Sequence, residues 1–314
     1  MIVVADVDAA AAQAAAVKGD CAWTDDWKIV VTHPDVDIVV VATPNAFLAE
    51  VSVAALGAGK HVLLEKPMGR SLQEARAIAA AASKSGKRVK VGFNHRYHPA
   101  IRRAHELFVN GGIGRLINLR IRYGHGGRPG YEKEWRGQPK LAGGGELTDQ
   151  GVHALDLLMW YAGVPRSVVG MTQSAVWPIA PLEDNGWALL RFEHDVVASF
   201  HTSWTQWKNL FCFEIFGENG ALVVEGLGGS YGVETLTSYE RAGSGGPPAA
   251  SIEKFEGPDQ SWKSEWGAFL DGILAGLPYD GDAEAGLDAM VVLDALYRSS
   301  ESGNVVQIRA TEPG

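Results

Sequence analysis

A lysine stands directly after a short apolar run, in the stretch HVLLEKPM at 61–68. The run has the composition of a buried strand, yet lysine is among the residue types least often buried. Pro67 ends the strand, because proline cannot donate to a central ladder, and it also restricts the backbone of the residue before it. A lysine near a strand end often only extends its ammonium group to water. Because Lys66 is fixed between Glu65 and this proline, we predict instead a functional group that is held in one geometry.

An aspartate and a histidine four residues apart form a second candidate pair, in GGGELTDQGVHALD at 143–156. On a helix, Asp149 and His153 stand on one face, about one turn apart. Removing a hydride from an alcohol carbon requires a base for the hydroxyl proton. A histidine of near-neutral pKa can take that proton, and a nearby carboxylate can stabilise the imidazolium. The Lys66 ammonium can stabilise the charge that develops on the same oxygen, so the three residues predict a catalytic set.

The same pair has a plainer interpretation. Asp149 would cap the N-terminus of the helix, and His153 would be a core residue with its hydrogen bonds satisfied. A zinc site is a weaker alternative, because an Asp-x3-His pair has no third ligand. We therefore expect no metal.

The first ninety or so residues alternate apolar strands with alanine-rich helices, as is typical of a doubly wound parallel sheet. The sequence predicts strands at 2–7, 36–44, 61–66 and 88–93, and helices at 9–19, 46–56 and 71–86. Ligands of such sheets bind beyond the carboxyl ends of the strands. The residues at three of these ends are Asp6, then Thr43, Pro44 and Asn45, then Glu65 and Lys66. We expect them to line one edge of the sheet.

The acidic residue after the first predicted strand suggests which ligand binds there. A carboxylate at this place accepts hydrogen bonds from the two hydroxyls of an adenosine ribose, and its charge repels a 2′-phosphate. Asp6 therefore predicts NAD rather than NADP as the cofactor. The alternative is that Asp6 only helps to cap the next helix, a role for which Asp8 is better placed.

The pattern changes after residue 93. A helix is predicted at 99–110 and another over the Asp149 and His153 segment, among mostly extended segments that include a hairpin at 216–226. A surface loop is predicted at 241–251 and a last helix at 283–303. We predict a Rossmann-type domain at 1–93 and a second domain at 94–314 with a large open mixed, mostly antiparallel sheet. The last helix is a candidate to pack back on the first domain.

Composition and charge narrow the class of protein. The 314 residues are 46% hydrophobic and 21% charged, which is ordinary for globular domains, and the net charge of −9 argues against a nucleic-acid partner. Two cysteines, Cys21 and Cys212, are too few for a disulfide framework and indicate a reducing compartment. No apolar run reaches the ~18–20 residues of a membrane span, and the N-terminus has no signal-peptide pattern. We expect a cytoplasmic protein.

Three motifs together resemble the Gfo/Idh/MocA oxidoreductases, the family of glucose–fructose oxidoreductase and inositol dehydrogenase. The motifs are ATPNAFLAEVSVAALGAGKHVLLEKPM, VGFNHRYHP and GGGELTDQGVHALD, and their order and spacing match over nearly the whole chain. The resemblance implies an NAD-binding Rossmann domain joined to a domain whose open sheet commonly forms the subunit interface. The long extended region rich in tryptophan, including FHTSWTQWKNLFCFEIFG at 200–217, predicts a homodimer or homotetramer that associates through this sheet.

The resemblance assigns roles to individual residues. It implies Lys66, Asp149 and His153 as the catalytic set. It implies cofactor contacts by Thr43, Pro44, Asn45, Glu65, Lys66 and Asn94, and an active-site border with the substrate made by Arg96, Tyr97 and Gln150. Four aromatic residues are separate candidates to stack on a sugar ring, although core packing or a sheet interface is the use that we favour: Tyr123, Trp135, Trp177 and Trp204.

Two features depart from the family pattern. Leu48 stands where the family usually has a histidine, at little expected cost because that histidine is not catalytic. The second departure is the lack of a G-x-G-x-x-G loop, since the chain begins at what should be the second strand. We expect an N-terminally truncated chain that binds NAD poorly. Without the central strand, the segments 2–7 and 36–44 have either to pair with each other or to leave unpaired edges.

The sequence therefore predicts an NAD-dependent oxidoreductase that acts on a sugar, a cyclitol or a sugar derivative. One alternative is a non-catalytic relative that serves as a ligand sensor or regulator, but retention of Lys66, Asp149 and His153 argues against it. Another is an NAD-dependent glycosidase that cleaves its substrate through a transient oxidation. The sequence does not identify the sugar.

Overall fold

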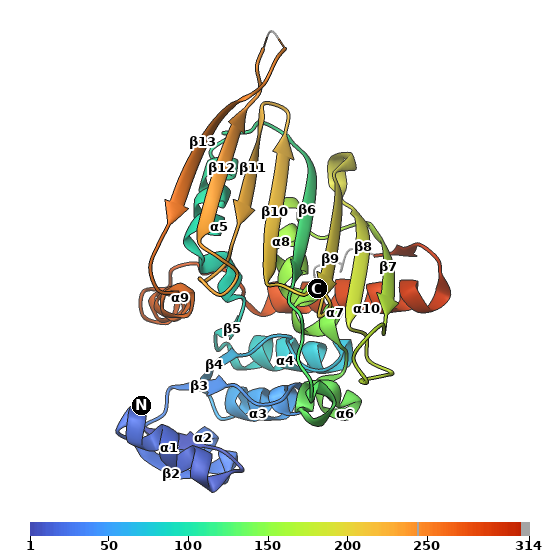
Figure 1. Cartoon of the computed structure of the whole chain (residues 1–314). Coiled ribbons are helices and arrows are strands. Elements are labelled where there is room, and N and C mark those ends of the chain that lie inside the picture. The colour runs from blue at the N-terminus through green and yellow to red at the C-terminus, as the bar shows by residue number, and fades with distance from the viewer. Residues whose placement is uncertain (244, 309–314) are drawn as a thin grey trace. The chain divides into compact units, whose positions relative to one another are not determined.

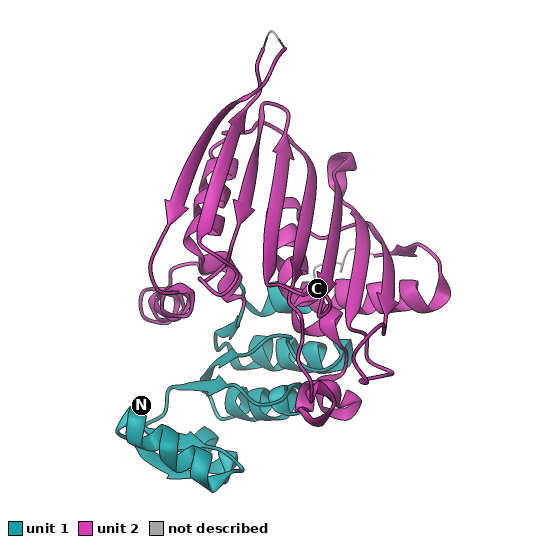
Figure 2. Ribbon diagram, in the orientation of Figure 1, with its two compact units in different colours: residues 1–92, 281–287 teal, residues 93–280, 288–314 magenta. Residues whose placement is uncertain are grey.

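The computed structural model describes residues 1–243 and 245–308. These residues fall into two compact units, shown separately in Figure 2. The first unit comprises residues 1–92 and 281–287, and the second comprises residues 93–280 and the chain from 288 onward. Within the described ranges, every helix is too short or too polar to span a bilayer.

Strands and helices alternate in the first unit, as the sequence predicts (Figure 1). Its elements are β1 (Val3–Ala5), α1 (Ala9–Gly19), β2 (Ala22–Thr24), α2 (Trp27–Thr32), β3 (Ile38–Val41), α3 (Asn45–Gly57), β4 (His61–Leu64), α4 (Leu72–Ser85) and β5 (Val89–Val91). Local capping explains where the helices begin and end. The Asp8 side chain accepts the first free N–H groups of α1, and Gly86 ends α4 in the left-handed conformation with φ 66°.

The strands of the first unit form two separate parallel sheets. One sheet has the order β3-β4-β5, and the other contains only β1 and β2. In the first of these, Val41 lies opposite Leu64, so the residues that follow β3 and β4 lie at the same edge. Among the described residues, β1 and β3 do not pair with each other. Each is an edge strand, which is the expected arrangement that leaves unpaired edges. Val40 of β3 is 56% exposed.

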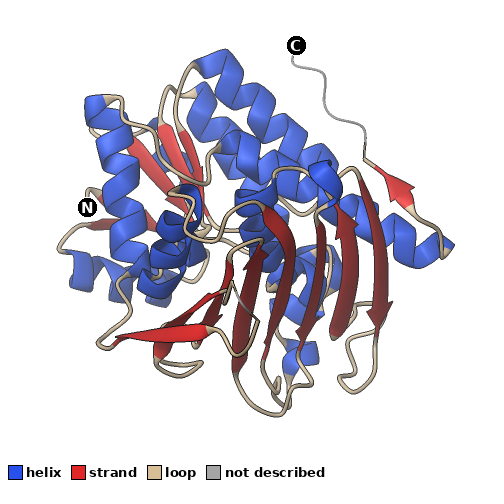
Figure 3. Ribbon diagram, turned by 90° about the horizontal axis from the view of Figure 1, so that it is seen from above, coloured by secondary structure: helices blue, strands red, loops and turns tan. Residues whose placement is uncertain are grey.

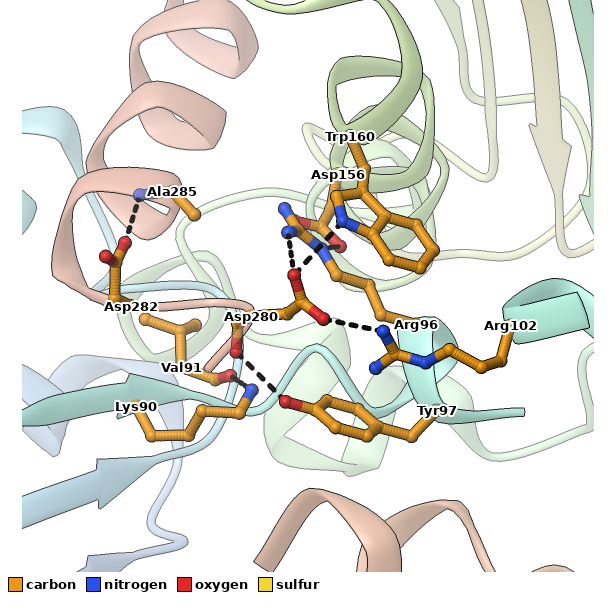
Figure 4. A network of polar contacts seen from close by, with 10 residues as sticks. All are labelled: Lys90, Val91, Arg96, Tyr97, Arg102, Asp156, Trp160, Asp280, Asp282 and Ala285. Carbon is orange, nitrogen blue, oxygen red and sulfur yellow. Dashed lines mark hydrogen bonds and ion pairs between the residues drawn. The ribbon is translucent and has the colours of Figure 1, made fainter. Parts of the chain in front are cut away.

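Residues 281–287 join the first unit because they pack along β5. The Val91 N–H donates to the Gly281 carbonyl at 2.8 Å, and Lys90 and Asp282 form an antiparallel bridge. The Lys90 side chain is fully buried, and its Nζ donates to the Val91 carbonyl at 2.6 Å (Figure 4). The Asp282 carboxylate accepts the N–H of Ala285 in the first turn of α10 (Ala283–Ser302).

A nine-stranded sheet forms the second unit, in the order β13-β12-β11-β10-β6-β9-β8-β7-β14. Its strands are β6 (Leu116–Gly124), β7 (Ser167–Gln173), β8 (Asn185–Arg191), β9 (Val197–Ser203), β10 (Leu210–Gly217), β11 (Gly220–Glu225), β12 (Glu234–Glu240), β13 (Ala249–Phe255) and β14 (Val306–Gln307). Only the pairing of β6 with β9 is parallel, and β10 and β11 form the predicted hairpin. The predicted fold class, a Rossmann-type sheet followed by a mixed and mostly antiparallel sheet, is thereby confirmed.

Helices gather on one face of this sheet (Figure 3). They include α5 (Pro99–Val109), α8 (Gly151–Ala162) and α10, beside the separate helix α9 (Ser261–Ala275). α8 is buried along nearly its whole length, which makes it the centre of the core of this unit. On the other face of β8, Trp187 and Leu189 are 37% and 55% exposed, alternating with buried Ala188 and Leu190. Val169 and Met171 lie opposite these two side chains in β7, and the four form an apolar patch on this uncovered face.

Two helical segments differ from the sequence prediction. The expected helix around Asp149 and His153 is two helices, α7 (Glu146–Asp149) and α8, which meet at Gln150. Because Gln150 keeps a right-handed helical backbone, the chain turns only slightly there. α9 was not predicted, because its buried positions include Ser261 and Glu265, and its apolar pattern does not follow the buried face.

Candidate active site

The edge beyond β3 and β4 brings together several residues that the sequence predicts for cofactor binding. Thr43 and Pro44 follow β3, and Asn45 begins α3 and is buried. Glu65 and Lys66 follow β4, where the Glu65 N–H donates to the Val41 carbonyl at 2.9 Å. The buried Thr43 hydroxyl has no hydrogen-bond partner among the described residues. A buried hydroxyl of this kind suits a bound ligand, because leaving it unsatisfied costs free energy.

Asp6 lies directly after β1 and is exposed. Its Oδ1 accepts the N–H of Asp8 at 2.9 Å, while Asp8 itself caps α1, as the sequence predicts. Asp8, and not Asp6, is thus the residue that caps α1. Its contact with a ribose stays a prediction.

His153 lies in α8 and is 5% exposed. The ring of His95 stacks on it face to face, with centroids 3.8 Å apart and an angle of 13° between the planes. Phe93 meets the same imidazole edge-on at 6.2 Å. His153 is therefore a buried imidazole that is held between aromatic neighbours.

Two polar neighbours, Asn94 and Tyr123, hold the ring of His95. The Asn94 Nδ2 donates to the Ser261 hydroxyl at 2.9 Å, which leaves the Asn94 Oδ1 facing the His95 Nδ1 at 3.1 Å. The Nδ1 therefore carries a proton, and the His95 Nε2 lies 3.1 Å from the Tyr123 hydroxyl, within hydrogen-bond distance. Burial raises the pKa of Tyr123 well above its ordinary value, so this hydroxyl keeps its proton. Both ring nitrogens of His95 are thus in contact with polar neighbours of the second unit.

Gln150, at the junction of α7 and α8, is joined to the same network. Its Nε2 donates to the Tyr231 hydroxyl at 2.9 Å, and the Tyr231 ring lies 5.3 Å from the ring of Tyr123. Two predicted substrate residues, Gln150 and Tyr123, are thus brought together within the second unit. Their contact with a substrate stays a prediction. Sequence reasoning missed His95 and Tyr231, although His95 stands inside the VGFNHRYHP motif.

Asp149 has a cationic neighbour that the sequence did not indicate. The Arg136 Nε lies 3.4 Å from the Asp149 Oδ2, and the Arg136 guanidinium lies 4.4 Å from the Trp135 ring centroid. Burial lowers the pKa of the nearby His125, although the Asp149 charge opposes that shift. Arg136 lies in a 3-10 helix of only three residues, Trp135–Gly137, which is too short to show a periodic pattern in the sequence.

Arg96 is held inside the second unit by carboxylates (Figure 4). Its Nε and Nη2 donate to the two carboxylate oxygens of Asp156 at 2.8 and 2.6 Å, and Asp280 lies 3.8 Å from its Nη1. Burial opposes the charge of Arg96, but Asp156 outweighs it and raises the pKa of the guanidinium. The guanidinium is therefore engaged by the protein. The predicted contact of Arg96 with the substrate stays a prediction.

Tyr97, predicted to border the active site, is anchored beside the same group. Its hydroxyl donates to the Asp280 carbonyl at 3.3 Å, and burial raises its pKa. Arg102 contacts the Tyr97 ring and donates to the Asp280 carboxylate at 2.9 Å. These contacts give Tyr97 a fixed place within the second unit.

The predicted sugar-stacking tryptophans fall in an apolar cluster of the second unit. The cluster consists of Tyr131, Ala142, Ile179, Leu182 and Trp204, with Trp135 and Trp177 packed against it. Trp204 is fully buried, and the Trp177 Nε1 donates to its carbonyl at 2.9 Å. Trp204 therefore packs in the core, which is the use that we favour from the sequence. Trp135 is only partly buried, and its contact with a sugar stays a prediction.

Two family models match the chain. Residues 1–93 match the oxidoreductase family with an NAD-binding Rossmann fold, and residues 101–223 match the GFO/IDH/MocA C-terminal domain. The 1,5-anhydro-D-fructose reductase of Ensifer adhaerens is 33% identical over 72% of this chain and 68% of its own length. The chain therefore belongs to the Gfo/Idh/MocA oxidoreductase family, and the predicted family is confirmed.

Two further relatives align with this chain over different shares of its length. The levoglucosan dehydrogenase of Pseudarthrobacter phenanthrenivorans is 30% identical over 64% of this chain, and the match spans 58% of that protein, less than two thirds of its length. The D-glucoside 3-dehydrogenase of Escherichia coli is 27% identical over 98% of this chain and 90% of its own length.

Solved structures share the fold. Levoglucosan dehydrogenase in complex with NADH and L-sorbose has a TM-score of 0.88 at 23% identity, covering 98% of this chain and 89% of that one. An oxidoreductase domain protein from Kribbella flavida has a TM-score of 0.86 at 28% identity, covering 98% and 90%. The architecture of the chain is thus that of known oxidoreductases.

Proposed function

We propose that this protein transfers a hydride between NAD and a hydroxyl-bearing carbon of a sugar or sugar derivative. The observation that carries the proposal is the register of β3 with β4, which sets Thr43 and Lys66 at the carboxyl edge of a Rossmann sheet. Ligands of doubly wound sheets bind at that edge. The names of three relatives, a levoglucosan dehydrogenase, an anhydrofructose reductase and a glucoside dehydrogenase, support a sugar-like substrate.

The described residues of the first unit fit the nicotinamide end of the cofactor. Thr43 offers a buried hydroxyl, Asn45 a buried amide, and Glu65 a half-buried carboxylate. Bound NAD would supply the hydride acceptor. The sequence contains no G-x-G-x-x-G stretch to hold the pyrophosphate, so we keep the prediction that the 314-residue chain binds NAD weakly.

Three side chains would carry the proton and the charge. His153 would accept the hydroxyl proton, and the Lys66 ammonium would donate to the same oxygen as negative charge develops there. Asp149 would favour the charged form of the histidine. The ring of His95, held by Asn94 and Tyr123, stacks on His153 and would keep its imidazole in one orientation.

A substrate panel tests the proposal. The purified chain is incubated with excess NAD and, separately, with levoglucosan, methyl glucoside, glucose, xylose and inositol, and NADH is followed by its near-ultraviolet absorbance. We expect NADH from at least one sugar and none from the His153→Ala variant. A chain that binds sugars but forms no NADH with any of them would indicate the sensor alternative. The cytoplasmic location stays a prediction from composition.

A further inference from the structure

Glu183 is a buried residue that lies two positions before β8. Its side chain and backbone bind the start of α7, the short helix that ends at Asp149. Its Oε1 accepts the N–H groups of Gly145 and Leu147, each at 3.0 Å, and the hydroxyl of Tyr297 at 2.7 Å. Its carbonyl oxygen accepts the N–H of Glu146 at 2.9 Å. Burial raises the pKa of Glu183, and the hydrogen bonds from Tyr297 and the backbone oppose that shift.

This carboxylate replaces a missing cap. Gly145 stands at the N-cap of α7 and has no side chain to accept the free N–H groups of the first turn. A side chain at Gly145 would collide with the Glu183 carbonyl oxygen, and one at Gly144 would collide with Thr148 and Tyr297. The glycines therefore allow the close approach, and Glu183 supplies the acceptor from a distant part of the sequence.

The hydrogen bonds around Tyr297 run in one direction. Tyr297 has one hydroxyl proton, which it donates to Glu183, so the Thr148 hydroxyl must donate to the Tyr297 oxygen at 2.7 Å. Thr148, Tyr297 and Glu183 thus form a chain that ends on a single carboxylate oxygen. That oxygen is the point to which both α7 and α10 are tied.

From Glu183 the hydrogen bonds continue to the catalytic candidates. The Gly145 carbonyl accepts the N–H of Asp149 at 2.9 Å, and the Glu146 carbonyl accepts the N–H of Gln150 at 3.0 Å. The Gln150 carbonyl then accepts the N–H of His153 at 3.0 Å. Any movement of the Gly145 backbone is therefore passed directly to Asp149, and it reaches His153 through Glu146 and Gln150.

We propose that Glu183 is a positioning residue, which holds α7 and the start of α8 so that Asp149 and His153 keep their working geometry. This role rests on the proposed function of these two residues. Displacing a reacting group by about 1 Å costs up to ~10²-fold in rate, so we expect Glu183→Ala to lower kcat by about 10- to 100-fold. The KM for NAD should stay unchanged.

The test follows the His153 imidazole directly by NMR of the 314-residue chain with isotope-labelled histidine. The His153 signal is assigned by its disappearance in His153→Gln. We expect Glu183→Ala to shift the His153 signal and Glu183→Gln to restore it, because the amide oxygen can still accept from Gly145, Leu147 and Tyr297. Glu193→Ala, which removes a surface carboxylate that is bound to Arg166, is the matched control and should leave the signal in place.

Tyr297→Phe keeps the Glu183 carboxylate and removes only the hydroxyl that donates to it. This variant replaces Glu183→Ala in the test if Glu183→Ala does not fold. It should shift the His153 signal in the same direction by a smaller amount. A parental His153 signal in folded Glu183→Ala or in Tyr297→Phe would overturn the proposal. So would equal shifts in the Ala and Gln variants. Lack of turnover by the parental chain would instead contradict the proposed function, and the NMR signal would remain readable.

Discussion

Removing the Arg96 guanidinium should destabilise the second unit severely. Arg96 donates two hydrogen bonds of 2.8 and 2.6 Å to Asp156, whose side chain is 0% exposed. Arg96→Met leaves that carboxylate in the core without the guanidinium. Breaking a buried pair from one side costs about 3–5 kcal/mol, and we expect a loss of this size in the free energy of unfolding.

Urea unfolding, followed by tryptophan fluorescence, measures this loss. Arg115→Met is the matched control, because the Arg115–Glu218 pair is 59% and 46% exposed and should contribute no more than about 1 kcal/mol. The double variant Arg96→Met/Asp156→Leu should recover most of the stability, since a well-packed apolar pair replaces a buried ionic one at little cost. A loss below about 1 kcal/mol in Arg96→Met would show that the buried pair does not stabilise the second unit. A parental sugar KM in the stable double variant would remove Arg96 from the predicted substrate contacts.

Four further predictions follow from the site, the cofactor, the sheet and the loops. Lys66→Ala and His153→Ala should each lower kcat by ~10²-fold or more with little change in melting temperature; near-parental turnover in both would contradict their catalytic roles. Calorimetry should show NAD binding that is weaker than micromolar but tighter than NADP binding, and the preference should disappear in Asp6→Ala; tighter NADP binding by the parental chain would remove Asp6 from the ribose role. Light scattering should show a dimer or tetramer at micromolar concentration, and Leu189→Lys on the uncovered face of β8 should shift it toward monomer, whereas a parental monomer would contradict the prediction. Burial opposes ionisation of Asp184, but hydrogen bonds from the N–H groups of Trp177, Ala175 and Val176 outweigh burial and lower the pKa of this carboxyl. The ionised carboxylate therefore stabilises the fold fully above about pH 4, and this stabilisation declines as the pH falls through the folded pKa. The melting temperature of Asp184→Asn should therefore lie below the parental value at pH 7 and approach it on acidification; a constant difference would contradict this.

The elements with strong local signals were predictable from the sequence. α1 and α4 have a side-chain cap at one end and a left-handed residue at the other, and both begin and end close to the predicted residues. The parallel strands β3 and β4 are short apolar runs, and their ends carry the predicted polar residues. Local chemistry determines these features, so the printed sequence contains the necessary information.

Features that depend on distant contacts were not predictable. The orientation of the His95 ring depends on Tyr123, 28 residues away, and the cap of α7 depends on Glu183, 38 residues from Gly145. β2 has three residues, too few to show a period, and the buried face of α9 includes a serine and a glutamate. In each case, the folded chain supplies the partner that makes the residue fit.

The proposed transfer of a hydride from a sugar to NAD can be followed directly with a deuterated substrate. The best sugar of the panel, deuterated at its ring carbons, is incubated with the parental chain and excess NAD, and the products are analysed by mass spectrometry. We expect NADH that carries one deuterium, in an amount equal to that of a sugar product that has lost one deuterium from carbon and one hydrogen from the hydroxyl group. NADH without deuterium, or cleavage of an aryl glycoside with no net NADH, would contradict it.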